Sequence, residues 1–271
     1  MQGPLSVKMI KTPSKIKFII LLIFSVCFLG RAFTGRRDLV IRVLNVGQGD
    51  SILITTPNNR LVLIDGGPNA GVVEKIPTKP PSFKCYVDVV VLTHAHSDHY
   101  TGLREVLERC TVPLLVINDD TPLKVYVKPD TQEAKAFYGD KFVVDGVNFE
   151  VVWPEMNYTS SDLNNMSIVL LMDSGSYKAL FTGDAETSLY NDLINAGLDF
   201  LKVPHHGSFD ENFGKFVEKT TPEILAISVG KNSYGHPDSR ILGVSTFYPV
   251  KIYRTDKDGD IKVSASAKAK K

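Results

Sequence analysis

Residues 87–99 read VDVVVLTHAHSDH and join an apolar run to a cluster of polar side chains. The run Val87–Leu92 is typical of a β-strand that is buried on both faces. The segment Gly102–Cys110 follows with apolar side chains at helical spacing, which predicts an amphipathic helix. We therefore expect a strand, then a loop that carries the polar cluster, and then a helix.

The polar loop holds four potential metal ligands within six residues, in the pattern His-x-His-x-Asp-His. Imidazole and carboxylate groups are ligands that zinc and similar metals accept. A turn in this loop could direct His94 and His96 to one ion, and Asp98 and His99 to a neighbouring ion. All six histidines of the chain lie beside predicted strands and none on a predicted helix. This density of ligand types favours a metal site over a structural role.

The rest of the chain is rich in short strands separated by turns. Leu39–Asn45, Ser51–Thr55 and Leu61–Ile64 are joined by tight turns, which predicts a β-meander. Further strands are expected at 142–144, 147–153, 168–172, 178–181, 200–203, 224–229, 251–254 and 261–263, and helices at 186–196 and 213–219. Two β-rich halves that each carry helices predict an αββα sandwich, an α+β fold in which two mixed sheets pack face to face with helices outside.

Composition limits the classes of protein to which the chain can belong. Of its 271 residues, 43% are hydrophobic and 23% are charged, as is ordinary for a globular protein. The net charge is only +1, so composition alone does not indicate a nucleic-acid-binding protein. We expect a basic N-terminus with a signal peptide or membrane anchor in residues 1–37, one globular domain in residues 38–263, and a disordered Ala/Ser/Lys tail in residues 264–271.

The N-terminal region contains the apolar stretch FIILLIFSVCFL at Phe18–Leu29, which follows four lysines and precedes Arg31. A basic flank before such a stretch is typical of a secretory signal or a short signal anchor. The stretch is shorter than the roughly 20 residues that a membrane span needs. A buried helix is the alternative, but it would show polar residues at helical spacing. We therefore expect export, with the protein secreted or anchored to the membrane by residues 18–29.

The three cysteines leave two interpretations open. Cys27 lies in the apolar stretch, whereas Cys85 and Cys110 stand apart without CxxC spacing. Outside the cytoplasm these two could form a disulfide, provided that their Cα atoms lie close enough. Otherwise they are two small buried hydrophobic side chains.

Several motifs beyond the histidine cluster resemble the metallo-β-lactamase superfamily, over roughly Leu39–Val263. The chain is similar in particular to the ComEC branch, the extracellular hydrolase domain of a bacterial competence protein. The motifs that carry this likeness are VLNVGQGDSILI (43–54), LIDGG (63–67), LTHAHSDH (92–99), NNMSIVLL (164–171), LFTGDAE (180–186), LKVPHHGS (201–208), SYGHP (233–237) and YRTDKDGDI (253–261). The resemblance implies the αββα sandwich that the strand pattern also predicts.

The resemblance also implies a role for each matching ligand. His94 and His96 would bind a first metal ion, and Asp98 and His99 would bind a second. Asp184 would bridge the two ions. An ion pair of this kind activates a water molecule for hydrolysis.

Four further residues receive roles that the sequence leaves less defined. His205 or His206 would complete the second site, and the glycine that follows favours His206. Asp65 would orient the histidine loop from behind, although an aspartate before two glycines is also ordinary turn chemistry. Asp98 and His236 are the residues that we expect to take part in catalysis, His236 by donating a hydrogen bond or a proton to the scissile group. A structural role for His236 in the turn before Pro237 is the alternative.

The chain departs from the wider superfamily at one ligand. A further histidine would be expected between the cluster and Asp184, and none occurs there. Its place is taken by Asn164, Asn165 and Ser167, whose oxygens are weaker ligands, and the ComEC branch is similar in this respect. We therefore expect one or two divalent metal ions, zinc or manganese, with the first site the weaker.

The resemblance implies phosphodiester hydrolysis, with single-stranded DNA as the expected substrate. Two other functions remain open: an exported hydrolase of a small ester, lactone or wall phosphodiester, and a non-catalytic metal-containing binding module. A set of lysines could follow a phosphate backbone, or could form an ordinary solvated surface. These are Lys124, Lys128, Lys202, Lys231, Lys251 and Lys257. The sequence identifies no protein partner.

Overall fold

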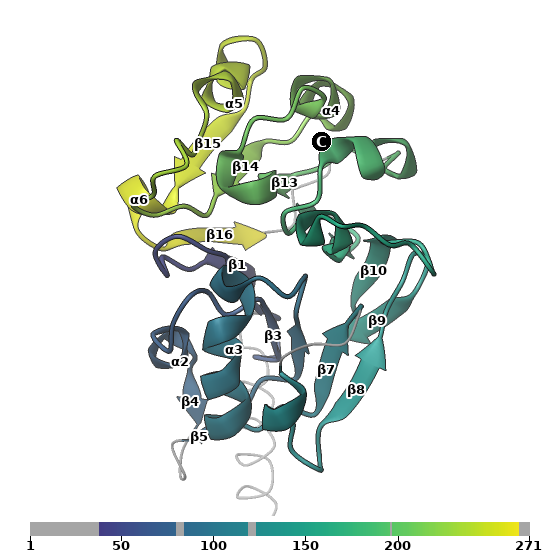
Figure 1. Cartoon of the computed structure of the whole chain (residues 1–271), viewed down its shortest axis with the longest axis vertical. Coiled ribbons are helices and arrows are strands. Elements are labelled where there is room, and N and C mark those ends of the chain that lie inside the picture. Colours follow the sequence, from purple (N-terminus) through teal and green to yellow (C-terminus); the bar gives the residue numbers. More distant parts are fainter. Residues whose placement is uncertain (1–37, 80–83, 119–122, 196, 266–271) are drawn as a thin grey trace, which may run out of the picture. The chain divides into compact units, whose positions relative to one another are not determined.

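The computed structural model describes residues 38–79, 84–118, 123–195 and 197–265 (Figure 1). The predicted signal or anchor segment and the last six residues lie outside these ranges. Among the described residues, no helix combines the length and apolar composition that crossing a bilayer requires.

Two mixed sheets of seven strands each, within the described ranges, form the body of the domain. The first has the order β16-β1-β2-β3-β6-β7-β8 and the second β15-β14-β13-β12-β11-β10-β9. The strands of the first sheet are β1 (Leu39–Val43), β2 (Ile52–Thr55), β3 (Leu61–Ile64), β6 (Val89–Val91), β7 (Leu114–Ile117), β8 (Gln132–Lys135) and β16 (Ile261–Ala265). Those of the second are β9 (Lys141–Val144), β10 (Val147–Trp153), β11 (Val169–Asp173), β12 (Lys178–Phe181), β13 (Phe200–Lys202), β14 (Ile224–Ile227) and β15 (Lys251–Arg254).

Helices and short turns connect the strands. The α-helices are α2 (Val72–Lys75), α3 (Ser97–Arg109), α4 (Phe213–Thr220), α5 (Ser239–Leu242) and α6 (Thr255–Asp258). The 3-10 turns are η1 (Lys124–Tyr126), η2 (Leu163–Met166), η3 (Thr187–Leu189), η4 (Asn191–Leu193), η5 (Pro204–Gly207) and η6 (Gly243–Thr246). A small hairpin pairs β4 (Thr78–Lys79) with β5 (Lys84–Cys85).

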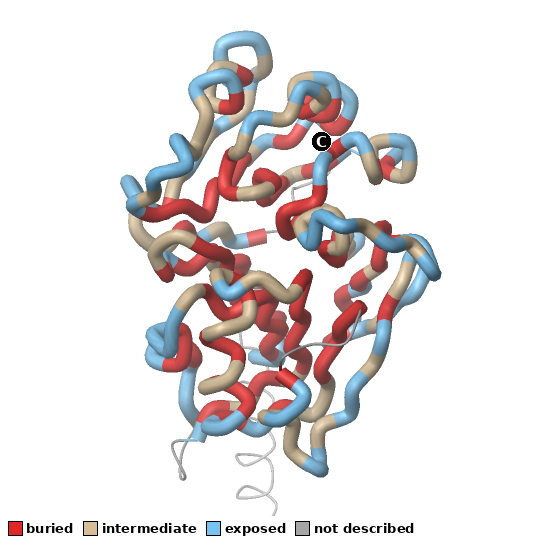
Figure 2. Tube along the Cα trace, viewed as in Figure 1, coloured by how far each residue is buried: buried red, intermediate tan, exposed pale blue. Residues whose placement is uncertain are grey.

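Three clusters of buried apolar side chains stabilise the sandwich, and strand β3 contributes to two of them. Its Val62 and Ile64 belong to the core between the two sheets, whereas Leu61 and Leu63 pack with residues of α2 and α3. A third cluster lies between the second sheet and α4 and α5. Because alternate side chains of a strand point to opposite faces, a strand buried on both sides must be apolar throughout. Figure 2 shows the buried residues concentrated along the strands. The predicted αββα sandwich is confirmed.

The last strand returns to the beginning of the chain. β16 lies beside β1 (Figure 1). The two strands pair antiparallel, and Leu39 lies opposite Ala265. The domain therefore extends to Ala265, and the prediction that disorder begins at residue 264 is wrong for its first two residues. Ser264 and Ala265 are ordered because they pair with β1 in the sheet. A segment of Ala, Ser and Lys gives no sign of this pairing in the sequence.

Two helix predictions differ from the structure. The helix expected at 186–196 is replaced by η3 and η4, and between them the backbone of the buried Tyr190 is not helical (φ −127°, ψ 0°). Helix α3 begins at Ser97 rather than Gly102, so His99 lies in its first turn, contrary to the expectation that no histidine lies on a helix. The hypothesis of a disulfide between Cys85 and Cys110, left open by the sequence, agrees with the structure, where their Cα atoms lie 4.7 Å apart.

Helix α3 packs on the turn after β3 at three glycines, Gly66 and Gly67 of the turn and Gly102 of the helix. The amide of Gly66 donates to the carbonyl of His99 at 2.7 Å, and the amide of Gly102 donates to the carbonyl of Gly67 at 2.9 Å. A methyl group at Gly102 would overlap the carbonyl oxygens of Gly66 and Asn69. Backbone atoms cannot move aside independently of the fold, so the helix itself would have to shift.

Gly102→Ala is expected to lower the free energy of unfolding by about 2 kcal/mol, the usual cost of overpacking. The matched control is Gly214→Ala in α4, where an added methyl meets open space. That variant should be stabilised by up to about 1 kcal/mol, because alanine lowers the entropy of the unfolded chain. Urea denaturation followed by circular dichroism measures both. Equal stability of the two variants would contradict the proposed packing.

Candidate metal centre

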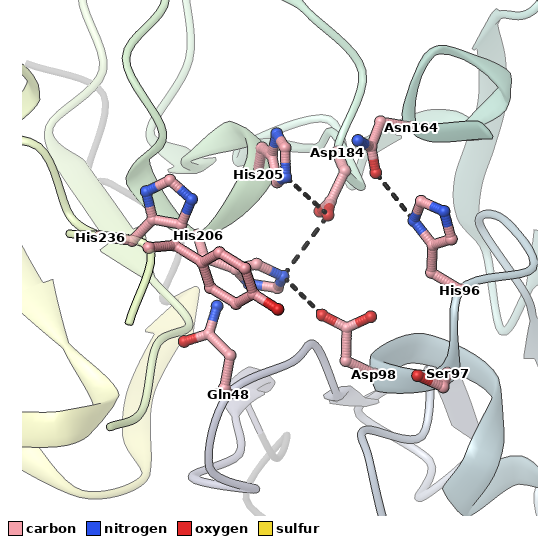
Figure 3. A pocket seen from close by; sticks show the side chains of 10 residues that line it. Gln48, His96, Ser97, Asp98, Asn164, Asp184, His205, His206 and His236 are labelled. Carbon is pink, nitrogen blue, oxygen red and sulfur yellow. Dashed lines mark hydrogen bonds and ion pairs between the residues drawn. The ribbon is translucent and has the colours of Figure 1, made fainter. Parts of the chain in front are cut away.

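The polar cluster predicted from the sequence lies at one end of the sandwich, where the loops that follow several strands meet. β3 and β6 run parallel in the first sheet, and β12, β13 and β14 run parallel in the second. The carboxyl ends of parallel strands lie at the same edge of a sheet. Side chains from the segments that follow strands of both sheets therefore line one pocket of about 320 Å³ (Figure 3). Its lining residues are Gln48, His96, Ser97, Asp98, Asn164, Asp184, His205, His206, Tyr234 and His236.

Asp65 fixes the orientation of His99. It follows β3 with a left-handed backbone (φ 57°), a conformation uncommon outside glycine. Its carboxylate accepts hydrogen bonds from the amide of Thr93 at 2.8 Å and from the Thr93 hydroxyl at 2.7 Å. It also accepts from His99 Nδ1 at 2.7 Å, which leaves His99 Nε2 directed to the site. A carboxylate that bonds the far nitrogen of a histidine in this way fixes the orientation of the ring.

Four side chains converge on the position predicted for the second metal ion. Asp184 Oδ2 lies 3.3 Å from His99 Nε2 and 3.4 Å from His206 Nε2. His206 Nε2 lies 3.2 Å from Asp98 Oδ2. Figure 3 shows Asp98, Asp184 and His206 directed at one another. They come from the first turn of α3 and from the loops after β12 and β13, so both sheets contribute.

The two oxygens of Asp184 face different partners. Oδ2 faces the histidines, whereas Oδ1 lies 3.6 Å from the ammonium group of Lys202. Lys202 is completely buried, pairs with Asp50 and donates to the carbonyl of Gly183 at 2.9 Å. One carboxylate oxygen of Asp184 therefore faces the pocket, and the other lies near the buried ammonium group of Lys202.

The two histidines after β13 face different surroundings. His206 has a side chain only 3% exposed, and its Nδ1 donates to the carbonyl of Ser228 at 2.9 Å. The side chain of His205 is 37% exposed and its Nε2 lies 3.9 Å from Asp184. Both backbones are left-handed, at φ 54° and 46°, and the turn they make separates the two rings. Burial and geometry thus favour His206 as the ligand.

The position predicted for the first metal ion is poorer in strong ligands. His94 Nε2 lies 3.0 Å from His96 Nδ1, which in turn lies 3.0 Å from Asn164 Oδ1. Ser167 Oγ accepts from the amide of Asp184 and lies 3.1 Å from His94 Nδ1, so it supports the site from behind. Asn165 is not brought to the pocket, because its side-chain oxygen accepts from the amide of Glu186.

His236 reaches the pocket from the loop after β14. Its ring centroid lies 5.6 Å from that of His205, and it shares the outer wall with Gln48 and Tyr234. It is not one of the converging groups at Asp184. The predicted catalytic histidine thus lines the pocket but stands apart from the proposed ligands at Asp184.

The donor atoms fit a metal ion. The Nε2 atom of His99 is buried and, among the described residues, has no hydrogen-bond partner. Because Nδ1 is hydrogen-bonded to Asp65, Nε2 is the ring nitrogen of His99 that faces the site. Sets of ligand atoms within 4.8 Å of one another occur in the described part of the chain at His94, His99 and Asp184, and at Asp98, His99 and His206. A divalent cation would give a partner to this buried nitrogen, among carboxylates that also bind metals.

The electrostatics of the centre follow from burial and close opposite charges. Burial alone would raise the pKa of Asp98, but the hydrogen bond from His206 and the charge of His99 lower that pKa to about 2. Burial would lower the pKa of His206, whereas Asp184, Asp50 and Asp98 raise it to about 9. The pKa of Asp184 lies well below its usual value, since His206, His99 and Lys202 outweigh its burial. The carboxylates are therefore ionised near neutral pH.

Two residues of the centre were missed from the sequence. Asp50 lies in the glycine-rich turn after β1, where an aspartate is ordinary turn chemistry. Its Oδ1 lies 3.3 Å from His206 Nδ1. Lys202 was expected among solvated or phosphate-contacting lysines, and its complete burial makes this wrong. The sequence feature that indicates this burial is the position of Lys202 between Leu201 and Val203, in a short apolar strand.

Comparisons with known proteins agree with this geometry. The sequence profile of the metallo-beta-lactamase superfamily matches residues 44–231. ComE operon protein 3 of Bacillus subtilis is 29% identical over 251 residues, which cover 82% of this chain and 32% of that protein. Competence protein ComA of Neisseria gonorrhoeae is 28% identical, with 82% and 32% covered. The chain thus spans about a third of the length of these relatives.

Solved structures share the fold at low sequence identity. The metallo-beta-lactamase fold protein YhfI of Bacillus subtilis superposes with a TM-score of 0.60 at 11% identity, over 84% of this chain and 99% of that one. CmlA of Streptomyces venezuelae, a diiron beta-hydroxylase, has a TM-score of 0.59 at 13% identity, over 85% and 55%. Since the profile covers more than half of the sequence and the fold agrees, the chain belongs to the metallo-beta-lactamase superfamily.

Proposed function

We propose that this protein is a metal-dependent phosphodiesterase that hydrolyses single-stranded DNA. The observation that carries the proposal is the convergence of donor atoms from Asp98, His99, Asp184 and His206 in one open pocket. Members of the superfamily are usually metal-dependent hydrolases. The relative named for competence, ComA of Neisseria gonorrhoeae, supports a nucleic-acid substrate, although the chain spans only about a third of its length.

The centre would hold one or two divalent ions, zinc or manganese. Asp98, His99, Asp184 and His206 would hold the tighter ion, and His94 and His96 the weaker one, with Asn164 in the place of a third nitrogen ligand. When bound, the metal supplies a water molecule whose pKa is lowered towards neutrality.

The chain's own residues prepare this site. Asp65 orients His99 from behind, and the carbonyl of Ser228 orients His206 in the same way. Lys202 neutralises part of the negative charge of the carboxylates. The site is therefore preorganised before substrate arrives.

His236 is the candidate donor to the scissile group. It lines the pocket, with its ring centroid 5.6 Å from that of His205, and would contact the substrate rather than the ions. Its replacement by alanine is expected to reduce turnover while metal content is unchanged. Unchanged turnover would contradict this role.

The test uses the purified full chain. Its metal content is measured, the metal is removed with a chelator, and zinc, manganese or magnesium is restored. Each form is then assayed on a single-stranded oligonucleotide and on bis-p-nitrophenyl phosphate. We expect metal-dependent cleavage of both substrates.

Other outcomes identify the alternatives. Cleavage of small esters or phosphodiesters with intact DNA would overturn the nuclease proposal in favour of a small-substrate hydrolase. Bound metal without hydrolysis of any substrate would overturn the enzyme proposal in favour of a binding module.

We further propose that the domain works outside the cytoplasm. The apolar stretch Phe18–Leu29 supports export, and so does the disulfide between Cys85 and Cys110, because disulfides persist mainly in oxidising compartments. Fractionation of cells that express the full chain, with thiol labelling before and after reduction, tests this. Reduced cysteines in a cytoplasmic fraction would contradict it.

A further inference from the structure

Tyr234 is a large aromatic residue on the wall of the metal pocket, yet 74% of it is exposed to solvent. An aromatic side chain that is mostly exposed contributes little to the hydrophobic core. Its neighbours in the pocket are polar or charged, so it supplies the broad apolar surface that the pocket otherwise lacks.

The loop that carries Tyr234 is held in place by its own hydrogen bonds. The side chain of Asn232 donates to the carbonyls of Gly230 and His236 at 2.9 Å, and accepts from the amides of Tyr234 and His236 at 3.1 Å. Gln48 accepts from the amide of Gly230 at 3.1 Å, which fastens the start of the loop to the first sheet.

The far end of this loop is fastened as well. The amide of Asp238 donates to the carbonyl of Gly207 at 2.8 Å, in the turn that carries His206. The position of Tyr234 therefore depends on that of the turn that carries His206. The loop that exposes Tyr234 is held at both ends by hydrogen bonds.

The ring of Tyr234 lies nearly parallel to that of His236, with an angle of 22° and centroids 5.8 Å apart. One face of the tyrosine ring is thus turned towards the imidazole, while most of its surface stays open. A fixed, exposed aromatic face beside a polar reaction centre is suited to a planar ring of a ligand.

We propose that Tyr234 stacks against a nucleobase adjoining the scissile phosphodiester, and so makes the protein prefer base-bearing strands. This proposal rests on the proposed function and specifies its substrate. Every base has a π-face, so the contact would be tolerant of sequence. Lys231, exposed on the same loop, is placed to approach the backbone of a strand held in this way.

The experiment compares two oligonucleotides of equal length on the metal-loaded full chain, one of thymidines and one of abasic residues. The wild type should show a KM about tenfold lower for the thymidine strand, within the usual range for one stacked base. In Tyr234→Ala the ratio of the two KM values should fall towards one, whereas Tyr234→Phe should preserve it. Tyr138→Ala is the matched control, because Tyr138 is also exposed, at 51%, and does not line the pocket.

The outcomes separate this proposal from the function on which it rests. Cleavage of the thymidine strand with an unchanged KM ratio in Tyr234→Ala overturns stacking and leaves the nuclease proposal standing. An equal rise of KM for both strands also overturns it, because Tyr234 would then act on the backbone or on the geometry of the site. Cleavage of bis-p-nitrophenyl phosphate without cleavage of either strand overturns both.

Discussion

Asp184→Asn is expected to remove metal from the centre and to lower phosphodiester hydrolysis by on the order of 1,000-fold or more. Even residues that only orient a ligand typically change metal affinity or activity by about 10- to 100-fold, and a ligand shared by two ions should matter more. Oδ2 of Asp184 faces His99 and His206 at 3.3 and 3.4 Å, and an amide there would bring no negative charge.

The measurement is the metal content per chain by mass spectrometry, together with turnover of bis-p-nitrophenyl phosphate. Asp173→Asn provides the matched control, since that aspartate also pairs with a lysine, Lys178, but lies outside the pocket. It should keep its metal and its activity and lose less than about 1 kcal/mol of stability. Full metal content in Asp184→Asn would rule out its role as a ligand.

The ligand cluster and the sandwich could be predicted from sequence because both depend on local pattern. His94, His96, Asp98 and His99 lie within six residues, at the junction of β6 and the first turn of α3, so their proximity follows from chain connectivity alone. Alternation and apolar runs likewise show which segments are strands, because the period of two reflects the geometry of the backbone.

Several of the features that were missed depend on contacts between distant residues. Ala265 pairs with Leu39 across almost the whole domain, and a short Ala/Ser segment gives no sign of its partner. β8 (Gln132–Lys135) is a mostly exposed edge strand, so it lacks the apolar pattern of buried strands. The predicted helix at 186–196 is also wrong, because local propensity is overridden by tertiary packing, in which Tyr190 is completely buried.

Lys202→Met is expected to lower the free energy of unfolding by about 3–5 kcal/mol, the usual cost of leaving one member of a buried ion pair without its partner. Lys202 is completely buried, pairs with Asp50 and lies 3.6 Å from Asp184. Burial alone would lower the pKa of Lys202, but these carboxylates raise it above its usual value, so the ammonium group stays charged. Its removal would leave two buried carboxylates that repel each other.

Urea denaturation in the presence of a chelator measures this effect without a contribution from bound metal. Lys215→Met, on the exposed face of α4, is the matched control and should change stability by less than about 0.5 kcal/mol. Adding Asp50→Asn to Lys202→Met should recover at least about 1 kcal/mol, because one of the two unpaired charges is then removed. If Lys202→Met were as stable as Lys215→Met, the carboxylates would tolerate burial without a cation, and Lys202 could not be the residue that makes their convergence on the metal site possible.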